Sequence, residues 1–241
     1  MPEQPTPDAV QQLVADLRSV FQERLESVVL YGASGHLPGS LAGGPRDVAY
    51  TLAVVESLLV GDLRACAGHA RAWRARKVAT PLLLTPRMLR RSLDVFPLEL
   101  AEILATHRVL LGPDPLAGLA VGREDIRRAC EVHARGHALH LREGFIESGA
   151  DPKRLARIVV DSAIPLASLL AGFSRLEGGT EAPAAFLDGL AARAGFEGAV
   201  LRAVEEAGRS GALSASDAEA YFPGYIDAVE RLVTYIDEWH G

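Results

Sequence analysis

The chain has 241 residues, a hydrophobic fraction of 49% and a formal net charge of −6. This length allows one large or two modest domains with a sizeable core. The acidic balance argues against general nucleic-acid binding, because phosphate backbones are held by an excess of cationic side chains. Two cysteines do not make a disulfide framework. No secretory leader and no uninterrupted apolar run of the roughly 18 residues that span a bilayer is visible, so we expect a cytoplasmic protein without membrane contact.

The first half of the chain alternates helical and strand patterns. A helix is expected from Asp8, a suitable N-cap, to about Glu26, because apolar residues recur there at three- and four-residue spacing. Pro81 places the third strand at an edge or a bulge, and Thr85 with Pro86 fits a helix start. The expected strands are 28–31, 48–55, 78–84 and 108–111, and the further helices are 58–76 and 98–106. This alternation predicts an α/β layer.

The second half, from Arg123 onward, has no strand pattern. Helices are expected near 123–148, 151–176, 182–195, 197–208 and 215–239, which predicts a bundle of five helices. Pro165 lies inside the second of these helices. The last helix has a wide apolar face, part of which must pack in the bundle, and any surplus would form a dimer surface.

The stretch 28–55 reads as a strand, a glycine- and proline-rich turn, and a second strand that is buried on both faces. The first strand ends in Tyr-Gly-Ala at 31–33, and Asp-Val-Ala at 47–49 opens the second. This layout resembles the opening of the polymerase-β-like nucleotidyltransferase superfamily, in particular proteins of the kanamycin-nucleotidyltransferase type. There the first strand ends in Tyr-Gly-Ser and the second carries Asp-x-Asp. The segments 95–99 and 107–115 are similar to the end of such domains.

The resemblance implies an α+β fold, in which a small mixed nucleotidyltransferase-like sheet flanked by helices precedes a C-terminal all-α helical bundle. The expected domains are an α/β domain at 1–121 and a helical bundle at 122–241. It also implies ATP or another nucleotide as ligand, Mg²⁺ as cofactor, and a homodimer. The ligand would lie between the sheet and the bundle.

Nucleotidyl transfer needs metal ions held by two or three carboxylates, since its barrier is mainly one of charge stabilisation and in-line positioning. An Asp-x-Asp pair points both carboxylates to one side of a strand. Gly32 and Asp47 match the family pattern, but Ala33 replaces its serine and Ala49 its second aspartate. Asp47 is therefore the one strand residue able to bind Mg²⁺, and Glu99 is the best further carboxylate. The nucleotide phosphates would meet backbone N–H groups of Gly32, Ala33, Ser34 and Gly35.

The leading hypothesis is thus a nucleotidyltransferase-like protein with an eroded metal site. Its catalysis would be impaired, and it would bind a nucleotide or a phosphorylated ligand. One alternative is an active Mg²⁺-dependent nucleotidyltransferase that modifies a small hydroxylated acceptor, with Asp47 and Glu99 as its carboxylates. A second alternative is a non-catalytic dimeric interaction or regulatory module.

Four residues of metal-ligating types share one face of the helix at 123–148, namely Cys130, His133, His137 and His140. Imidazole and thiolate suit a transition metal such as Zn²⁺. One straight helix rarely supplies more than two ligands, so either His133 with His137 or His137 with His140 is the realistic pair, and it would need partners from elsewhere. The alternative is a packed, hydrogen-bonded histidine.

Cationic residues at 74–77 and 87–91 form a second candidate cluster. They would make a basic lip beside the turn at 32–46 or, alternatively, a solvated helix face. The residues concerned are Arg74, Arg76, Lys77, Arg87, Arg90 and Arg91.

Overall fold

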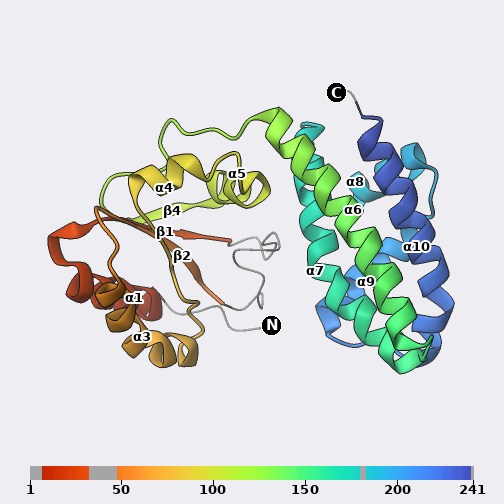
Figure 1. Ribbon diagram of the computed structural model, residues 1–241, viewed down its shortest axis with the longest axis horizontal. Helices are drawn as coiled ribbons and strands as arrows, with labels where there is room; N and C mark the ends of the chain where they lie inside the picture. Colours follow the sequence, from red (N-terminus) through yellow and green to blue (C-terminus); the bar gives the residue numbers. More distant parts are fainter. Residues whose placement is uncertain (1–6, 33–47, 180–182, 240–241) are drawn as a thin grey trace. The chain divides into compact units, whose positions relative to one another are not determined.

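The computed structural model describes residues 7–32, 48–179 and 183–239. The chain divides into two compact units, Met1–Gly122 and Arg123–Gly241. The elements of the first unit are α1 (Pro7–Phe21), the 3₁₀ helix η1 (Gln22–Arg24), β1 (Leu25–Tyr31), β2 (Tyr50–Val55), α3 (Val60–Ala75), β3 (Leu82–Leu84), α4 (Pro86–Arg91), α5 (Pro97–Thr106) and β4 (Arg108–Leu111) (Figure 1).

The sheet of the first unit has the strand order β3-β2-β1-β4. β1 is antiparallel to both β2 and β4, whereas β2 is parallel to β3, so the sheet is mixed. The short β3 lies at an edge, as Pro81 predicted. Every residue of β2 is buried, as expected for a strand that is covered on both faces.

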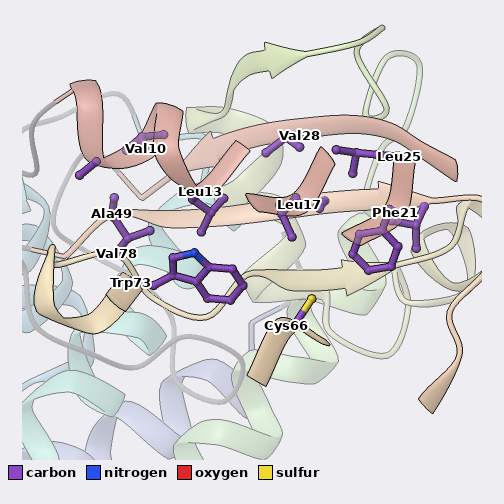
Figure 2. Close-up of a cluster of buried hydrophobic side chains, with 13 residues drawn as sticks. Val10, Leu13, Leu17, Phe21, Leu25, Val28, Ala49, Cys66, Trp73 and Val78 are labelled. Atoms are coloured by element: carbon purple, nitrogen blue, oxygen red, sulfur yellow. The ribbon is translucent and has the colours of Figure 1, made fainter. Parts of the chain in front are cut away.

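Helices cover both faces of this sheet (Figure 1). α1 and α3 pack on one face, where alternate strand residues join a cluster that includes Leu13, Leu17 and Trp73 (Figure 2). On the other face, Leu89 of α4 and Leu100 of α5 pack against the remaining strand residues. Side chains that alternate between two buried faces are what a central strand of a layered α/β unit requires.

The first helix is shorter than expected and ends at Phe21, not near Glu26. Gln22 takes a left-handed backbone with φ of 54°, η1 follows, and β1 begins at Leu25. Leu25 fits a helical spacing and is equally suited to the alternating burial of β1, where it pairs with Val55. The pairing between strands therefore decides the conformation of this segment, because its local sequence pattern fits both a helix and a strand.

Two polar contacts fasten the helices beneath the sheet. The Arg24 guanidinium makes two hydrogen bonds, of 2.9 and 2.8 Å, to the Asp62 carboxylate at the start of α3. The Leu59 N–H donates to the same carboxylate, and these donors, Arg24 first, lower the pKa of Asp62 to about 2. The Trp73 indole N–H donates to Asp16 of α1 over 2.8 Å and so ties α3 to α1.

The second unit consists of the five expected helices, and α6 has the predicted bounds. Side-chain caps explain where two of the later helices start, since Asp151 accepts from the Arg154 N–H and Ser214 from the Asp217 N–H. The helices are α6 (Arg123–Ser148), α7 (Pro152–Leu176), α8 (Pro183–Ala194), α9 (Gly198–Ser210) and α10 (Ala215–Asp237). The small mixed sheet and the helical second unit confirm the predicted α+β fold.

One helix, α7, departs from the expectation that no apolar run is long enough to span a bilayer. By length and composition alone it is apolar enough to cross a membrane, because charged residues interrupt its apolar stretch without removing it. Half of that stretch is buried inside the protein, and α7 packs against α6, α9 and α10. A central helix of a bundle has this same composition.

Candidate functional site

The candidate site lies at the end of the sheet where β1 finishes and β2 begins. Tyr31 and Tyr50 are paired across the two strands, with ring centroids 6.2 Å apart. Gly32 follows Tyr31 with φ of 75°, a left-handed conformation that glycine adopts without steric cost. The predicted residues Ala33, Ser34, Gly35 and Asp47 lie outside the described residues, so their roles stay predictions.

α5 reaches this end of the sheet through Thr106. The Gly32 N–H donates to the Thr106 hydroxyl oxygen over 3.4 Å. The Thr106 hydroxyl in turn donates to the Glu102 carbonyl, 2.8 Å away and one turn earlier in α5. The last turn of α5 is therefore tied to the residue at which the glycine-rich turn starts.

Two buried carboxylates belong to the same face of α5 as Thr106. Glu99 and Glu102 are only 5% and 2% exposed, and their spacing of three, with Thr106 at seven, places all three residues along one stripe. Within the described chain, no hydrogen bond or ion pair reaches the Glu99 carboxylate. A buried carboxylate is costly unless a donor or cation meets it, so Glu99 is a candidate for binding a cation or a hydroxyl group.

Glu99 was predicted from the sequence, whereas Glu102 was not. Its signal was nevertheless present, because acidic residues three apart in a short apolar helix share one face. What the sequence did not reveal is the link from this stripe to Gly32, which depends on the hydrogen bond of Thr106.

Ala49 stands where the family pattern has a second aspartate, and its surroundings are apolar. It is 6% exposed and belongs to the same cluster as Val10, Trp73 and Val78 (Figure 2). Its N–H donates to the Lys77 carbonyl and its carbonyl accepts from the Ala79 N–H, both over 2.9 Å. A carboxylate in this place would be buried among hydrocarbon side chains, where charge is strongly disfavoured.

The predicted basic lip is wrong, because its two groups lie on opposite faces of the sheet. Arg74 lies in the last turn of α3 and Arg76 directly follows it, on the face of Trp73, whereas Arg87 and the other α4 arginines lie on the face of Leu89. In addition, β3 runs parallel to β2, so α4 starts at the opposite end of the sheet from Tyr50.

The histidine stripe of α6 is used differently along its length. Ser162 donates to the Val159 carbonyl, so Tyr225 must donate to Ser162, over 2.9 Å, and His137 Nε2 must donate to the Tyr225 hydroxyl, over 2.7 Å. This buried chain joins α6, α7 and α10. Burial lowers the pKa of His137 to about 4, with a smaller contribution from His140.

The other members of the stripe are separate from this chain of hydrogen bonds. Cys130 is fully buried, which raises the pKa of its thiol to about 12, and His140 contacts Glu143 at the surface. Over residues 7–32, 48–179 and 183–239, no three His, Cys, Asp or Glu side chains gather as a metal site would need. The His133–His137 metal pair therefore stays a prediction, without a third ligand in the described part of the chain.

Comparison with known proteins places the fold in a class. No protein-family profile and no curated protein matches the sequence. The sheet and bundle nevertheless match solved structures, and they define a nucleotidyltransferase-like fold. One such structure is the spectinomycin adenyltransferase AAD(9) from Enterococcus faecialis, crystallised with ATP and spectinomycin. It is 12% identical, the TM-score is 0.54, and the match covers 94% of this chain and 99% of that one. The resemblance to nucleotidyltransferases is thus confirmed for the fold.

Proposed function

We propose that the protein binds a nucleotide or another phosphorylated ligand at the sheet end around Gly32, and that its nucleotidyl-transfer activity is impaired. The observation that carries this proposal is the end of β1, where Gly32 takes a left-handed backbone at the start of the glycine-rich turn and its N–H is held by Thr106 of α5. In the matched adenyltransferase structure, ATP is one of the bound molecules. A nucleotide is therefore the first ligand to test.

The impairment follows from the supply of oxygen ligands. A magnesium ion prefers octahedral oxygen ligands, and two-metal transfer needs several carboxylates on one side of the phosphates. The described residues supply Glu99 and Glu102, both on α5, whereas Ala49 supplies none and lies among apolar side chains. Asp47 would have to complete the set. Mg²⁺ binding is accordingly proposed to be weak, with the nucleotide held mainly by backbone N–H groups.

An active Mg²⁺-dependent nucleotidyltransferase acting on a small hydroxylated acceptor is the second candidate. It is favoured by the buried Glu99, because this residue together with Asp47 would give more than one metal ligand. In this case Asp47 and Glu99 are the catalytic residues. A non-catalytic regulatory module without a ligand is the third candidate.

Two measurements separate these three functions. Thermal unfolding with ATP, with and without Mg²⁺, reports binding, and pyrophosphate release from ATP with hydroxylated acceptors reports transfer. A shift with ATP in EDTA and no pyrophosphate supports the proposal. Metal-dependent pyrophosphate release that Asp47→Ala abolishes supports the enzyme, whereas turnover unchanged in Asp47→Ala rules out a metal role for this residue. No response in either assay leaves the regulatory module.

The remaining assignments are part of the same proposal. We place the protein in the cytoplasm, as a homodimer without general affinity for nucleic acid. The formal charge of −6 supports the last point, because it opposes binding to a phosphate backbone.

A further inference from the structure

The pairing of β1 with β4 determines which residue of α5 meets Gly32. The two strands are antiparallel, and Leu30 of β1 pairs with Arg108, the first residue of β4. Two residues further along β1 therefore correspond to two residues before Arg108, so the same register brings Gly32 opposite Thr106. Thr106 is the last residue of α5. The end of a helix thus stands where the next strand partner of Gly32 would be.

The Thr106 hydroxyl takes the place of a strand carbonyl at this position. It donates its single hydrogen to the Glu102 carbonyl over 2.8 Å, so its lone pairs are left to accept the Gly32 N–H, 3.4 Å away. A hydroxyl group with one acceptor and one donor as partners has a fixed direction. The Gly32 N–H is therefore bound within the protein, at the residue where a φ of 75° ends the extended backbone of β1.

The end of α5 that carries this hydroxyl is itself held in place. In the ring of His107, Nδ1 lies 3.1 Å from the Ile103 carbonyl oxygen and Nε2 lies 3.2 Å from the Asp114 carboxylate. Asp114 also accepts from the Leu116 N–H over 2.9 Å. These contacts connect the last turn of α5 to the segment that follows β4. Thr106 is therefore a fixed point from which the start of the glycine-rich turn can be positioned.

We infer that Thr106 is a positioning residue for the ligand site and that it acts through Gly32. The inference rests on the proposed function and deepens it. Before the ligand arrives, the hydroxyl holds Gly32 in the conformation from which the glycine-rich turn starts. Without the hydroxyl, Gly32 can take other backbone directions at little steric cost. Since only the competent conformation binds, the apparent Kd then rises in proportion to the population that is lost.

This inference gives Gly32 a different role from the one that the family resemblance implies. The resemblance assigns the Gly32 N–H to the nucleotide phosphates. In the structure, this N–H donates to the Thr106 hydroxyl. On our inference, Gly32 serves the ligand through its left-handed conformation, and its N–H hydrogen-bonds Thr106 instead of a phosphate.

Hydrogen exchange of the Gly32 amide, followed by NMR in the ligand-free full chain, tests the positioning itself. Thr106→Val removes the hydroxyl and keeps the shape of the side chain, so the Gly32 N–H should exchange about ten-fold faster than in wild type. Thr106→Ser keeps the hydroxyl and should keep the protection. Equal exchange in wild type and Thr106→Val overturns the inference. Because no ligand is present, this measurement decides the inference even if wild type does not bind ATP, a result that would refute the proposed function.

Calorimetric titration with ATP in EDTA tests the consequence for the ligand. Thr106→Val should raise the Kd about five-fold, and Thr106→Ser less than about two-fold. Gly32→Ala should raise the Kd as well, because alanine takes a φ of 75° only with strain. If Thr106 acts through Gly32, Thr106→Val should add little in the Gly32→Ala background. A further rise of the full five-fold there, or no rise from Thr106→Val alone, overturns the inference.

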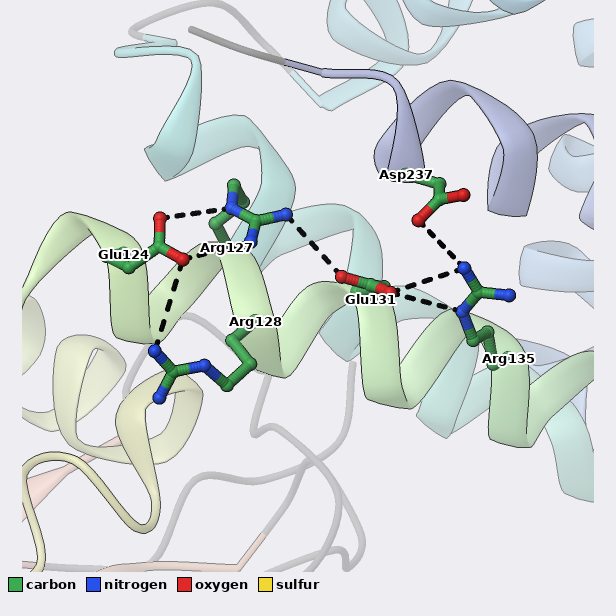
Figure 3. Close-up of polar contacts among 6 residues, drawn as sticks. All are labelled: Glu124, Arg127, Arg128, Glu131, Arg135 and Asp237. Atoms are coloured by element: carbon green, nitrogen blue, oxygen red, sulfur yellow. Dashed lines mark hydrogen bonds and ion pairs between the residues drawn. The ribbon is translucent and has the colours of Figure 1, made fainter.

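Two control variants remove polar contacts from the second unit and should leave both measurements unchanged. Thr234→Val is the matched control, because the Thr234 hydroxyl, like that of Thr106, donates to the carbonyl four residues earlier in its helix, over 3.2 Å. Arg135→Gln breaks the ion pair of 2.7 Å with Asp237 of α10 (Figure 3). An effect of either control as large as that of Thr106→Val would mean that the loss is not specific to Gly32 and overturns the inference.

Discussion

The two units of the molecule use their charged side chains in opposite ways. The first unit contains 12 basic and 12 acidic residues, whereas the second contains 13 and 19. In the second unit, most arginines form ion pairs with neighbouring acids: Arg127, Arg128, Arg135, Arg142, Arg157, Arg193, Arg202, Arg209 and Arg231. In the described part of the first unit, Arg24 is the arginine that does so, with Asp62.

The difference in ion pairing indicates that the arginines of the two units have different roles. Surface ion pairs add little stability, so the pairing in the second unit mainly removes its arginines from use by a ligand. Among the described residues of the first unit, Arg74 and Arg87 form no such pair, and that unit also holds the buried carboxylates of α5. This contrast agrees with the proposal that the first unit binds the ligand.

The largest expected effect comes from removing the indole that joins α1 to α3. Trp73 is 1% exposed and donates to Asp16, so Trp73→Ala should destabilise the first unit by about 3–5 kcal/mol through loss of packing. Each unit has one tryptophan, and Trp239 meets Phe173 edge-to-face in the second. Urea unfolding of Trp73→Ala, followed by Trp239 fluorescence, should show an unchanged second unit. A parallel loss in the second unit would mean that the two units unfold together.

The second-largest expected effect is a loss of stability of the second unit at acid pH. His137 has a folded pKa of about 4 against 6.5 in the unfolded chain, so the unfolded state binds more protons as the pH falls from 6.5 to 4. The second unit should lose about 3 kcal/mol over this window. Asp62 of the first unit, with its pKa lowered to about 2, stays ionised until lower pH and loses its contribution only below its unfolded value of 3.8.

Urea unfolding at pH 7.5 and pH 4.5, followed by Trp239 fluorescence, measures this acid effect. His137→Gln should remove most of the pH dependence, because its side chain does not titrate. An equal acid loss in His137→Gln would assign the effect to other groups.

A smaller effect is expected from the hydroxyl at the centre of the buried chain. Tyr225→Phe keeps the ring but leaves the His137 N–H without its partner, which should cost the second unit about 1–3 kcal/mol. Ser162→Ala, which removes the far end of the chain, is the matched comparison and should cost less. Equal and negligible losses in both variants would show that the chain contributes no stability.

The smallest effect is expected at the surface ion pairs. Arg142→Gln breaks the contact with Glu230 between α6 and α10 and should cost less than about 1 kcal/mol, reduced further by salt. Chemical denaturation in low and high salt measures it. A loss of several kcal/mol would make these pairs a structural requirement.

Much of the fold could be predicted because local signals and tertiary packing agree. The starts of α7 and α10 carry side-chain caps at Asp151 and Ser214, so their positions follow from local chemistry. The end of α1 could not be predicted, because Leu25 satisfies both helical and strand periodicity and its pairing with Val55 decides. Periodicity cannot show which chain segment a residue will pair with.

The candidate site was only partly predictable for the same reason. Gly32 and Glu99 were found from a resemblance to a family. The contribution of Glu102 and Thr106 could not be predicted, because it depends on the contact of α5 with the end of β1. The prediction of a basic lip was wrong because the sequence does not show the direction of β3. With β3 parallel to β2, α4 starts at the end of the sheet opposite Tyr50, and it packs on the face opposite α3.

The central claim is that the first unit binds a nucleotide. It is tested most directly by urea unfolding of Trp239→Phe, in which Trp73 is the remaining fluorophore of the first unit, with and without ATP. At an ATP concentration of about 100 times Kd, the Trp73 transition should rise by about 2.7 kcal/mol, in EDTA as well as in Mg²⁺. A transition that millimolar ATP leaves unmoved under both conditions would contradict the account.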